Sequence, residues 1–213
     1  MKRKKLYAAS ALIAAFILWT AVVSFIDVQA IGPQGSRVGL SAVNGWFHGL
    51  TGVHMALYTV TDWLGLVPVA VVMVFAMLGL IQWIKRKRFF LVDRSILILG
   101  GFYVIVMGAY LLFEELVINY RPVLIDGYLE SSYPSSTTLL VLCVMPTAML
   151  QLRSRIRIKW LRAAVLAAMA AFMVFMVIGR AVSGVHWLSD IIGGGLLSAG
   201  LVLLYRYTVQ HFE

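Results

Sequence analysis

Long apolar runs divide the chain into six stretches, each close to the length that crosses a bilayer. A transmembrane helix needs about 20 consecutive, mostly apolar residues, and irregular backbone cannot face lipid, so each run is expected to be helical. The sequence therefore predicts an all-α bundle of six transmembrane helices, forming a single membrane domain over residues 1–213. The predicted spans are approximately 6–30, 63–84, 95–113, 137–152, 163–179 and 188–205.

The first apolar run has a second interpretation. Basic residues Lys2 to Lys5 precede it, and Val28-Gln29-Ala30 at its end offers small residues of the kind found at signal-peptide cleavage sites. The apolar stretch is about 20 residues long, however, whereas the apolar core of a signal peptide has about 7–15. We therefore expect this run to be retained as the first helix.

The connection between the first two runs, about 31–62, is long enough to hold an element of its own. It opens with turn-forming residues, and apolar residues then recur at the spacing of one helix face. These residues are Val43, Trp46, Phe47, Leu50 and Val53. We predict a short amphipathic helix that lies on the outer surface and caps the bundle. Its His48 and His54 are interpreted mainly as interfacial polar residues, with a position facing a site as the alternative.

Basic residues indicate the orientation. All but three of the 18 Lys and Arg residues lie at the amino terminus, in the loops after the second and fourth runs, or after the sixth. Six spans put all these places on one side, which the positive-inside rule makes cytoplasmic. Both termini are then cytoplasmic, and Arg37, Arg121 and Arg180 lie on the extracytoplasmic side. Short loops favour a plasma membrane, such as a bacterial inner membrane.

Composition supports lipid as the solvent. Hydrophobic residues make up 62% of the chain, against about 45–50% in ordinary soluble domains. The net charge of +9 is confined to short loop clusters, a pattern that indicates membrane topology and not nucleic-acid binding. The single cysteine, Cys143, excludes an intrachain disulfide and a metal site built on thiolates.

Two polar groups stand at the expected outer ends of the helices. One runs from Glu114-Glu115 through Arg121-Pro122 to the segment 133–138, and the other runs from Gly179 to Asp190. Asp190 follows His186 by four residues, so a helix beginning near His186 would put both on one face. A carboxylate beside an imidazole fixes its tautomer and raises its basicity, as a general base or nucleophile requires.

Two arginines can join this pair. Arg180 ends the fifth run and Arg121 comes from another helix end, and two guanidinium groups beside such a histidine suit a phosphate group. Backbone N–H groups near Ser135 and Ser136, at the start of the fourth helix, would add donors. Each residue alone could be a headgroup contact or a helix cap. The four together favour a functional site.

These residues resemble the signatures of a known family. Gly179-Arg180, five residues, His186, three residues and Asp190 resemble the third motif of the type-2 phosphatidic acid phosphatase superfamily. Arg121-Pro122 resembles the end of its first motif, and Pro134-Ser135 the start of its second. The order, spacing and topology agree over about 31–205.

The resemblance implies hydrolysis of lipid phosphate esters or pyrophosphates without a metal or other cofactor. His186 would attack phosphorus and form a phosphohistidine, and Asp190 would orient it. Arg121 and Arg180 would hold the phosphoryl oxygens, with Ser135 contributing. The implied partners are the bilayer and a lipid phosphate or polyprenyl pyrophosphate substrate.

Two positions depart from the family pattern. Glu114 stands where the first motif has lysine, and Thr137 stands where the second motif has the histidine that protonates the leaving group. General acid catalysis contributes about 10²–10⁴ in rate. A phosphate leaving group needs little protonation, which favours a pyrophosphate substrate. Alternatively another acid serves, from Glu114, Glu115, His48 or His54, or hydrolysis has been abandoned.

Three functions follow, in order of preference. The first is a lipid phosphatase acting through a phosphohistidine. The second is a phosphoryl or headgroup transferase that uses the same site, and the third is a catalytically silent protein that binds lipid phosphates. A channel or transporter is disfavoured because the inner halves of the six runs hold no charged residue.

Overall fold

The computed structural model describes residues 2–212, and its regular elements are α-helices with two short 3-10 turns, Pro33–Gly35 and Phe89–Leu91. Six helical segments in this range are long and apolar enough to cross a membrane, which confirms the predicted all-α bundle. They are α1 (Lys2–Phe25), α3 with α4 (Met55–Leu64 and Leu66–Arg86), α5 (Arg94–Glu115), α6 (Ser136–Arg155), α7 (Lys159–Val182) and α8 (Leu188–Phe212).

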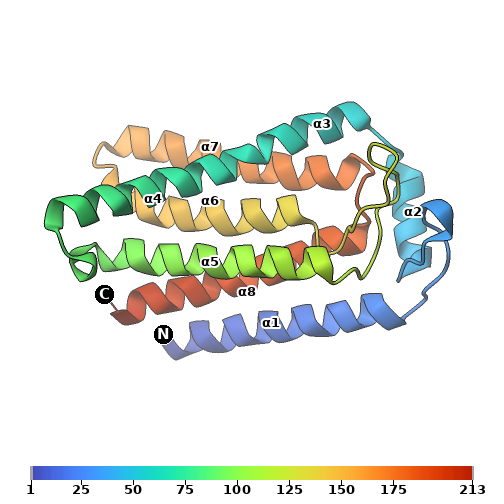
Figure 1. Ribbon diagram of the computed structural model, residues 1–213, viewed down its shortest axis with the longest axis horizontal. Helices are drawn as coiled ribbons and strands as arrows, with labels where there is room; N and C mark the ends of the chain where they lie inside the picture. The colour runs from blue at the N-terminus through green and yellow to red at the C-terminus, as the bar shows by residue number, and fades with distance from the viewer. Residues whose placement is uncertain (1, 213) are drawn as a thin grey trace.

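The long helices run side by side, with α6 and α8 in the interior (Figure 1). Helix α1 packs along α8, and α6 contacts α4, α5, α7 and α8. Glycines in α8 permit this close approach, because a Cβ at Gly200 would lie 2.8 Å from Ile13 and one at Gly193 would lie 2.7 Å from the Tyr133 ring. Small residues at helix contacts are the usual means by which membrane helices pack closely.

Several predicted helix boundaries differ from the structure: the fifth span begins at Lys159 and not at about 163, and the sixth runs to Phe212 and not to about 205. Two further differences have a local cause. The first helix ends at Phe25 and not near residue 30, because Asp27 adopts a positive φ and its carboxylate accepts the backbone N–H of Ala42. The second span begins at Met55, eight residues before the predicted residue 63. The Thr59 and Thr61 hydroxyls bond to carbonyls one turn earlier in the helix, so these polar residues do not interrupt it.

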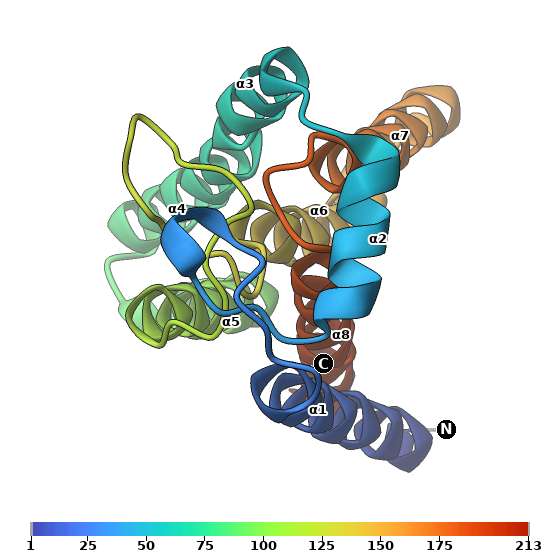
Figure 2. The same cartoon turned by 90° about the vertical axis from the view of Figure 1, so that its right-hand side faces the viewer.

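A short helix, α2 (Ser41–Thr51), lies across one end of the bundle, as predicted (Figure 2). Its polar residue Asn44 is buried against α8, where its side chain accepts the backbone N–H of Ser189 and donates to the Ser189 hydroxyl. The apolar residues Val43, Trp46 and Leu50 are exposed. Helix α2 is therefore fastened to the protein by its polar face, and its apolar face points away from it.

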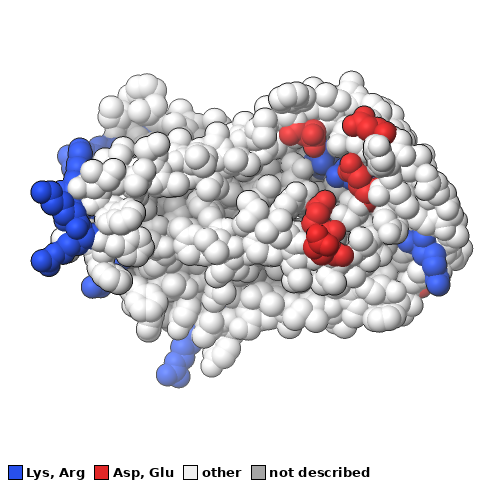
Figure 3. All heavy atoms as spheres, viewed as in Figure 1, with Lys and Arg blue, Asp and Glu red and all other residues white. Residues whose placement is uncertain are grey.

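Charges separate between the two ends of the bundle. Both termini lie at the end opposite α2 (Figure 1), and Lys and Arg side chains project from that end in the space-filling view (Figure 3). Acidic side chains instead gather around a hollow near α3 and α5, with basic atoms visible inside it (Figure 3). The protein is an integral membrane protein with chemically different ends.

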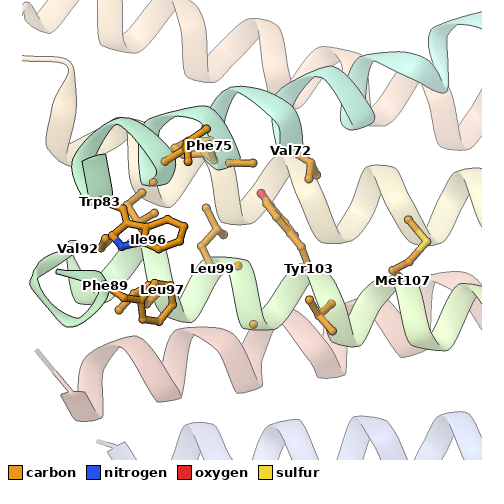
Figure 4. A pocket seen from close by; sticks show the side chains of 16 residues that line it. Val72, Phe75, Trp83, Phe89, Val92, Ile96, Leu97, Leu99, Tyr103 and Met107 are labelled. Carbon is orange, nitrogen blue, oxygen red and sulfur yellow. The ribbon is translucent and has the colours of Figure 1, made fainter. Parts of the chain in front are cut away.

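An apolar groove of about 490 Å³ runs between α4 and α5 (Figure 4). Val72 and Phe75 line one side and Leu99 and Met107 the other, and its described lining holds no charged residue. Tyr103 is the main polar side chain there, and its hydroxyl lies 3.3 Å from that of Thr147. This groove therefore offers no charged catalytic group.

Candidate functional site

His186 lies in the short connection between α7 and α8 and is 2% exposed. The preceding Gly184 has φ +71°, and a Cβ there would lie 1.9 Å from the carbonyl oxygen of Gly52. A glycine is therefore needed for the turn that brings the imidazole into the protein. The Nδ1 atom of His186 lies 3.1 Å from the Ser132 hydroxyl oxygen, and that hydroxyl donates to Asp190 Oδ2 at 2.5 Å.

These contacts select one tautomer of His186. Arg180 Nη2 lies 3.4 Å from His186 Nε2, and because a guanidinium can only donate, Nε2 must be the unprotonated nitrogen. Nδ1 then carries the proton and donates it to the Ser132 hydroxyl oxygen. The Ser132 hydroxyl in turn donates to Asp190. Burial, followed by the positive charges of Arg121 and Arg180, lowers the pKa of His186 well below its ordinary value. The imidazole is therefore neutral, with an unprotonated Nε2 that faces Arg180.

Asp190 is fully buried and saturated with donors. Besides Ser132, it accepts the backbone N–H of Trp187 at 2.9 Å and lies 3.4 Å from the Asn119 amide nitrogen and 3.3 Å from the Ser189 hydroxyl. Because α8 begins at Leu188, His186 precedes the helix, and the expected sharing of one helix face is wrong. The loop nevertheless brings the imidazole close to Asp190. The Asp190 carboxylate also caps the start of α8, because it accepts the backbone N–H of Trp187.

Arg180 lies in the last turn of α7 and is 1% exposed. Its Nη1 lies 3.4 Å from Asp62 Oδ1, and its guanidinium lies 5.0 Å from the ring centre of Tyr58. Its Nε–H has no hydrogen-bond partner among residues 2–212. A buried guanidinium with an unused donor is prepared to bind an anion, since leaving such a donor unpaired is costly.

Arg121 comes from the connection between α5 and α6 and is 9% exposed. Its Nε lies 3.1 Å from Glu130 Oε2, an ion pair without hydrogen-bond alignment, and Nη1 also has no partner in the described chain. The guanidinium lies 5.9 Å from the Tyr58 ring centre. One tyrosine ring thus contacts both arginines, which brings the two predicted phosphate-binding cations together.

A cavity of about 650 Å³ opens beside the two arginines. A narrow crevice adjoins it and reaches His186, and the two spaces share Tyr110, Glu114, Arg121, Ser131 and Ser136. His186 lines the crevice, and Arg180 lines the larger cavity while contacting Nε2 of the imidazole. The two arginines and the imidazole are therefore reached from one continuous opening.

Residues 113–213 match the family model of the PAP2 superfamily. This part of the chain, just under half of it, is similar to the PAP2 superfamily. The match confirms the resemblance to the type-2 phosphatidic acid phosphatases that the motifs predict. No curated protein matches the chain significantly.

The fold agrees with a solved PAP2 structure. It resembles the crystal structure of the first transmembrane PAP2 type phosphatidylglycerolphosphate phosphatase from Bacillus subtilis, with a TM-score of 0.56 and 18% sequence identity. The similarity covers 97% of this chain and 98% of that one, so it includes the helices that precede the matched PAP2 region. At this identity the likeness concerns the fold.

Ser135, which resembles the serine of the second motif, does not lie where its expected part in phosphate binding would require. Ser135 is buried at the N-cap of α6, where its hydroxyl oxygen accepts from the Thr138 hydroxyl at 3.0 Å, and it lines neither space. Ser136 lines both spaces instead. Thr137, which stands where the resemblance expects the histidine of the second motif, lines the larger cavity, as does Arg180.

The candidates for a substitute acid separate clearly. Glu114 lines both spaces, whereas Glu115 is exposed and lines neither. His48 packs its ring 5.4 Å from that of Trp187, and His54 bonds to the Thr51 carbonyl at 2.8 Å. Neither histidine lines the cavity or the crevice, so of the four only Glu114 stands where a substrate would bind.

Four site residues were not predicted from the sequence: Ser132, Tyr58, Asp62 and Glu130. Tyr58 and Asp62 were assigned to a loop, although they lie one turn apart on α3 and both meet Arg180. The spacing of four residues between an aromatic residue and a carboxylate was an available signal. Ser132 and Glu130 lie in an irregular connection, where no periodicity indicates which way they face.

Proposed function

We propose that this protein is a membrane lipid phosphatase that works through a phosphohistidine formed at His186. The observation that carries the proposal is the buried imidazole whose Nε2 is unprotonated and lies 3.4 Å from Arg180, with a second guanidinium nearby. The superfamily match supports phosphatase chemistry at the level of the family. A neutral imidazole is a nucleophile, and fixed cations stabilise charge on the transferring phosphoryl group.

The reaction has two displacements. Nε2 of His186 attacks phosphorus, an Nε2–P bond forms, and the bond from phosphorus to the leaving oxygen breaks with its electrons. Arg121 and Arg180 hold the non-bridging oxygens throughout, which is the main electrostatic task in phosphoryl transfer. The Ser132–Asp190 chain stabilises the positive charge that develops on the ring. Water then attacks the phosphohistidine, giving inorganic phosphate and the free imidazole.

With Thr137 at the position of the second-motif histidine, the site lacks the family's usual proton donor. The leaving group must therefore need little protonation or receive its proton from another group. A phosphate leaving from a polyprenyl pyrophosphate meets the first condition. Glu114 is the carboxyl group that lines both spaces and could meet the second. A polyprenyl pyrophosphate is therefore one substrate to test, and Glu114 is the residue to test as the acid. Phosphatidylglycerolphosphate, which is named for the Bacillus protein, is a second substrate to test.

The proposal includes a topology. Both termini face the cytoplasm and the cavity faces the extracytoplasmic side, since the basic residues gather at the end opposite α2 (Figure 3). A substrate in the outer leaflet would then present its phosphate at the level of α2. The apolar face of α2, with Trp46 and Leu50 exposed, suits the interface between headgroups and acyl chains.

The decisive test is phosphate release by the purified protein in detergent from a panel of lipid phosphates and pyrophosphates. We expect turnover by the wild type, its loss in His186→Gln, and a labelled, acid-labile protein phosphate in the wild type alone. His48→Gln is the matched control, because His48 lies at the same end outside both spaces. Transfer without free phosphate would indicate a transferase. Equal turnover by wild type and His186→Gln would overturn the proposal.

A further inference from the structure

The cavity that holds the two arginines also holds three carboxylates, Asp62, Glu114 and Glu130. They come from different elements: α3, the end of α5, and the connection between α5 and α6. With Arg121 and Arg180 the described lining therefore contains more acidic than basic groups. This composition is unusual for a site that binds a phosphate by itself, because each carboxylate repels the phosphate.

The arginines nevertheless require an anion. Both are at least nine-tenths buried, and Arg121 Nη1 and Arg180 Nε have no hydrogen-bond partner among the described residues. Their ion pairs are loose, since the Asp62 side chain is 55% exposed and the Glu130 side chain 42%. Pairs that are open to solvent are weak and can be exchanged for a bidentate phosphate contact. A bound phosphoryl group then leaves the carboxylates without cations.

Glu114 differs from the other two carboxylates. It is exposed, makes no ion pair within residues 2–212, and lines both the cavity and the crevice that leads to His186. Tyr110, one helical turn earlier on α5, lines the same two spaces and lies within electrostatic reach of Glu114 and Arg121. A carboxylate and an aromatic ring one turn apart form a common arrangement for holding an ammonium group.

The carboxylates of the described chain do not by themselves ligate a metal ion. Among residues 2–212 no three His, Cys, Asp or Glu side chains converge closely enough to hold one. An organic ammonium group needs only one carboxylate, and it can be attached to the same molecule as the phosphate. A polyprenyl pyrophosphate carries several negative charges and no cation, so it fits this lining less well.

We propose that the substrate is a lipid phosphate whose leaving group carries an ammonium group, bound by Glu114 and Tyr110 while Arg121 and Arg180 hold the phosphoryl group. This inference rests on the proposed phosphatase function and names its substrate class. The replacement of a PAP2 lysine by Glu114 is then a change of specificity: one cation of the site is supplied by the substrate. The ammonium group, close to the departing oxygen, also donates the proton that the leaving alcohol needs in the absence of the second-motif histidine.

The test compares two probes that differ in one charge: the 1-phosphate of a long-chain 2-amino alcohol and its N-acetyl derivative. We expect the wild type to hydrolyse the amine at least about tenfold faster in kcat/KM, the effect of about 1.4 kcal/mol from one charged contact. Glu114→Gln should remove this preference by slowing the amine alone. Glu115→Gln is the matched control, because its exposed side chain lies outside both spaces.

Each outcome bears on one of the two proposals. Equal turnover of both probes, or a Glu114→Gln loss that is the same for both, overturns the ammonium proposal and makes Glu114 a general acid or a bystander. Turnover confined to other lipid phosphates also overturns it, while the phosphatase function stands. Thermal stabilisation of His186→Gln by each probe measures recognition without turnover. Preferential stabilisation by the amine supports the ammonium site, and equal stabilisation contradicts it.

Discussion

The Nδ1 atom of His186 lies 3.8 Å from the nearest carboxylate oxygen of Asp190, too far for a direct hydrogen bond. The Ser132 hydroxyl fills the gap, at 3.1 Å from Nδ1 and 2.5 Å from Asp190 Oδ2. The carboxylate therefore acts on the imidazole through a serine. Ser132 is a positioning residue, since it holds the tautomer in which Nε2 is unprotonated.

Ser132→Ala should lower kcat while the protein stays folded. Without the hydroxyl, Nδ1–H and Asp190 each lose a partner, and by analogy with the outer-shell partners of metal-bound histidines the loss is about 10–100-fold. Ser132→Thr keeps the hydroxyl and should retain most activity. Steady-state kinetics should show the change in kcat with little change in KM. An unchanged kcat in Ser132→Ala would mean that the relay has no function.

The acid limb of the activity profile should lie below the ordinary imidazole pKa. Burial and the two arginines lower the pKa of His186, so the neutral nucleophile persists below about pH 6.5, where a free histidine is protonated. Arg121→Gln removes one of these charges and should move the limb toward higher pH. The measurement is kcat/KM from neutral to acidic pH, and a limb that is the same in both proteins would contradict this account.

Stability should depend on pH through the same residue. Because the folded-state pKa of His186 is depressed, the unfolded chain takes up the proton first as the pH falls. The stabilising contribution of the neutral imidazole is complete above about pH 6.5 and declines below it, until the pH passes the folded-state pKa. The melting temperature of His186→Gln should fall less between neutral and mildly acidic pH than that of the wild type.

Gly193→Ala should destabilise the site from a distance. The added Cβ would lie 2.7 Å from the ring of Tyr133, which is buried, stacks on Phe16 and bonds to the Thr20 hydroxyl. Overpacking of this kind costs about 1–3 kcal/mol, and Tyr133 adjoins Ser132, so activity should fall too. Thermal unfolding in detergent measures the effect. Gly195→Ala is the control, since nothing lies within 4 Å of its added Cβ.

The topology makes a labelling prediction. Cys143 is buried, so the wild-type protein should not react with a membrane-impermeant thiol reagent on intact cells. Arg37→Cys, at an exposed position in the loop before α2, should react, whereas Lys87→Cys, exposed between α4 and α5, should react only after the membrane is opened. The opposite pattern would invert the orientation and place the cavity in the cytoplasm.

Several features could be predicted because they are local along the chain. Hydropathy and helical periodicity depend on neighbouring residues, and they predicted the six spans and the helix that became α2. The motif spacing predicted that Arg180, His186 and Asp190 belong together, and the structure joins them within one loop and its flanking helices. Helix ends were less accurate, because hydroxyl groups bonded within a helix look polar in sequence.

The sequence by itself determined a six-helix membrane bundle, its separated charges, and an Arg, His and Asp constellation. Only the tertiary structure decided that Ser132 links His186 to Asp190 and that Glu130 pairs with Arg121, while Glu114 makes no ion pair with the residues that the structure describes. It also decided that α2 is bound by its polar face. Ser132 is 54 residues from His186, and Asp62 is 118 from Arg180. Such contacts are set by how distant helices and irregular connections pack against one another, and no local pattern along the chain encodes that packing.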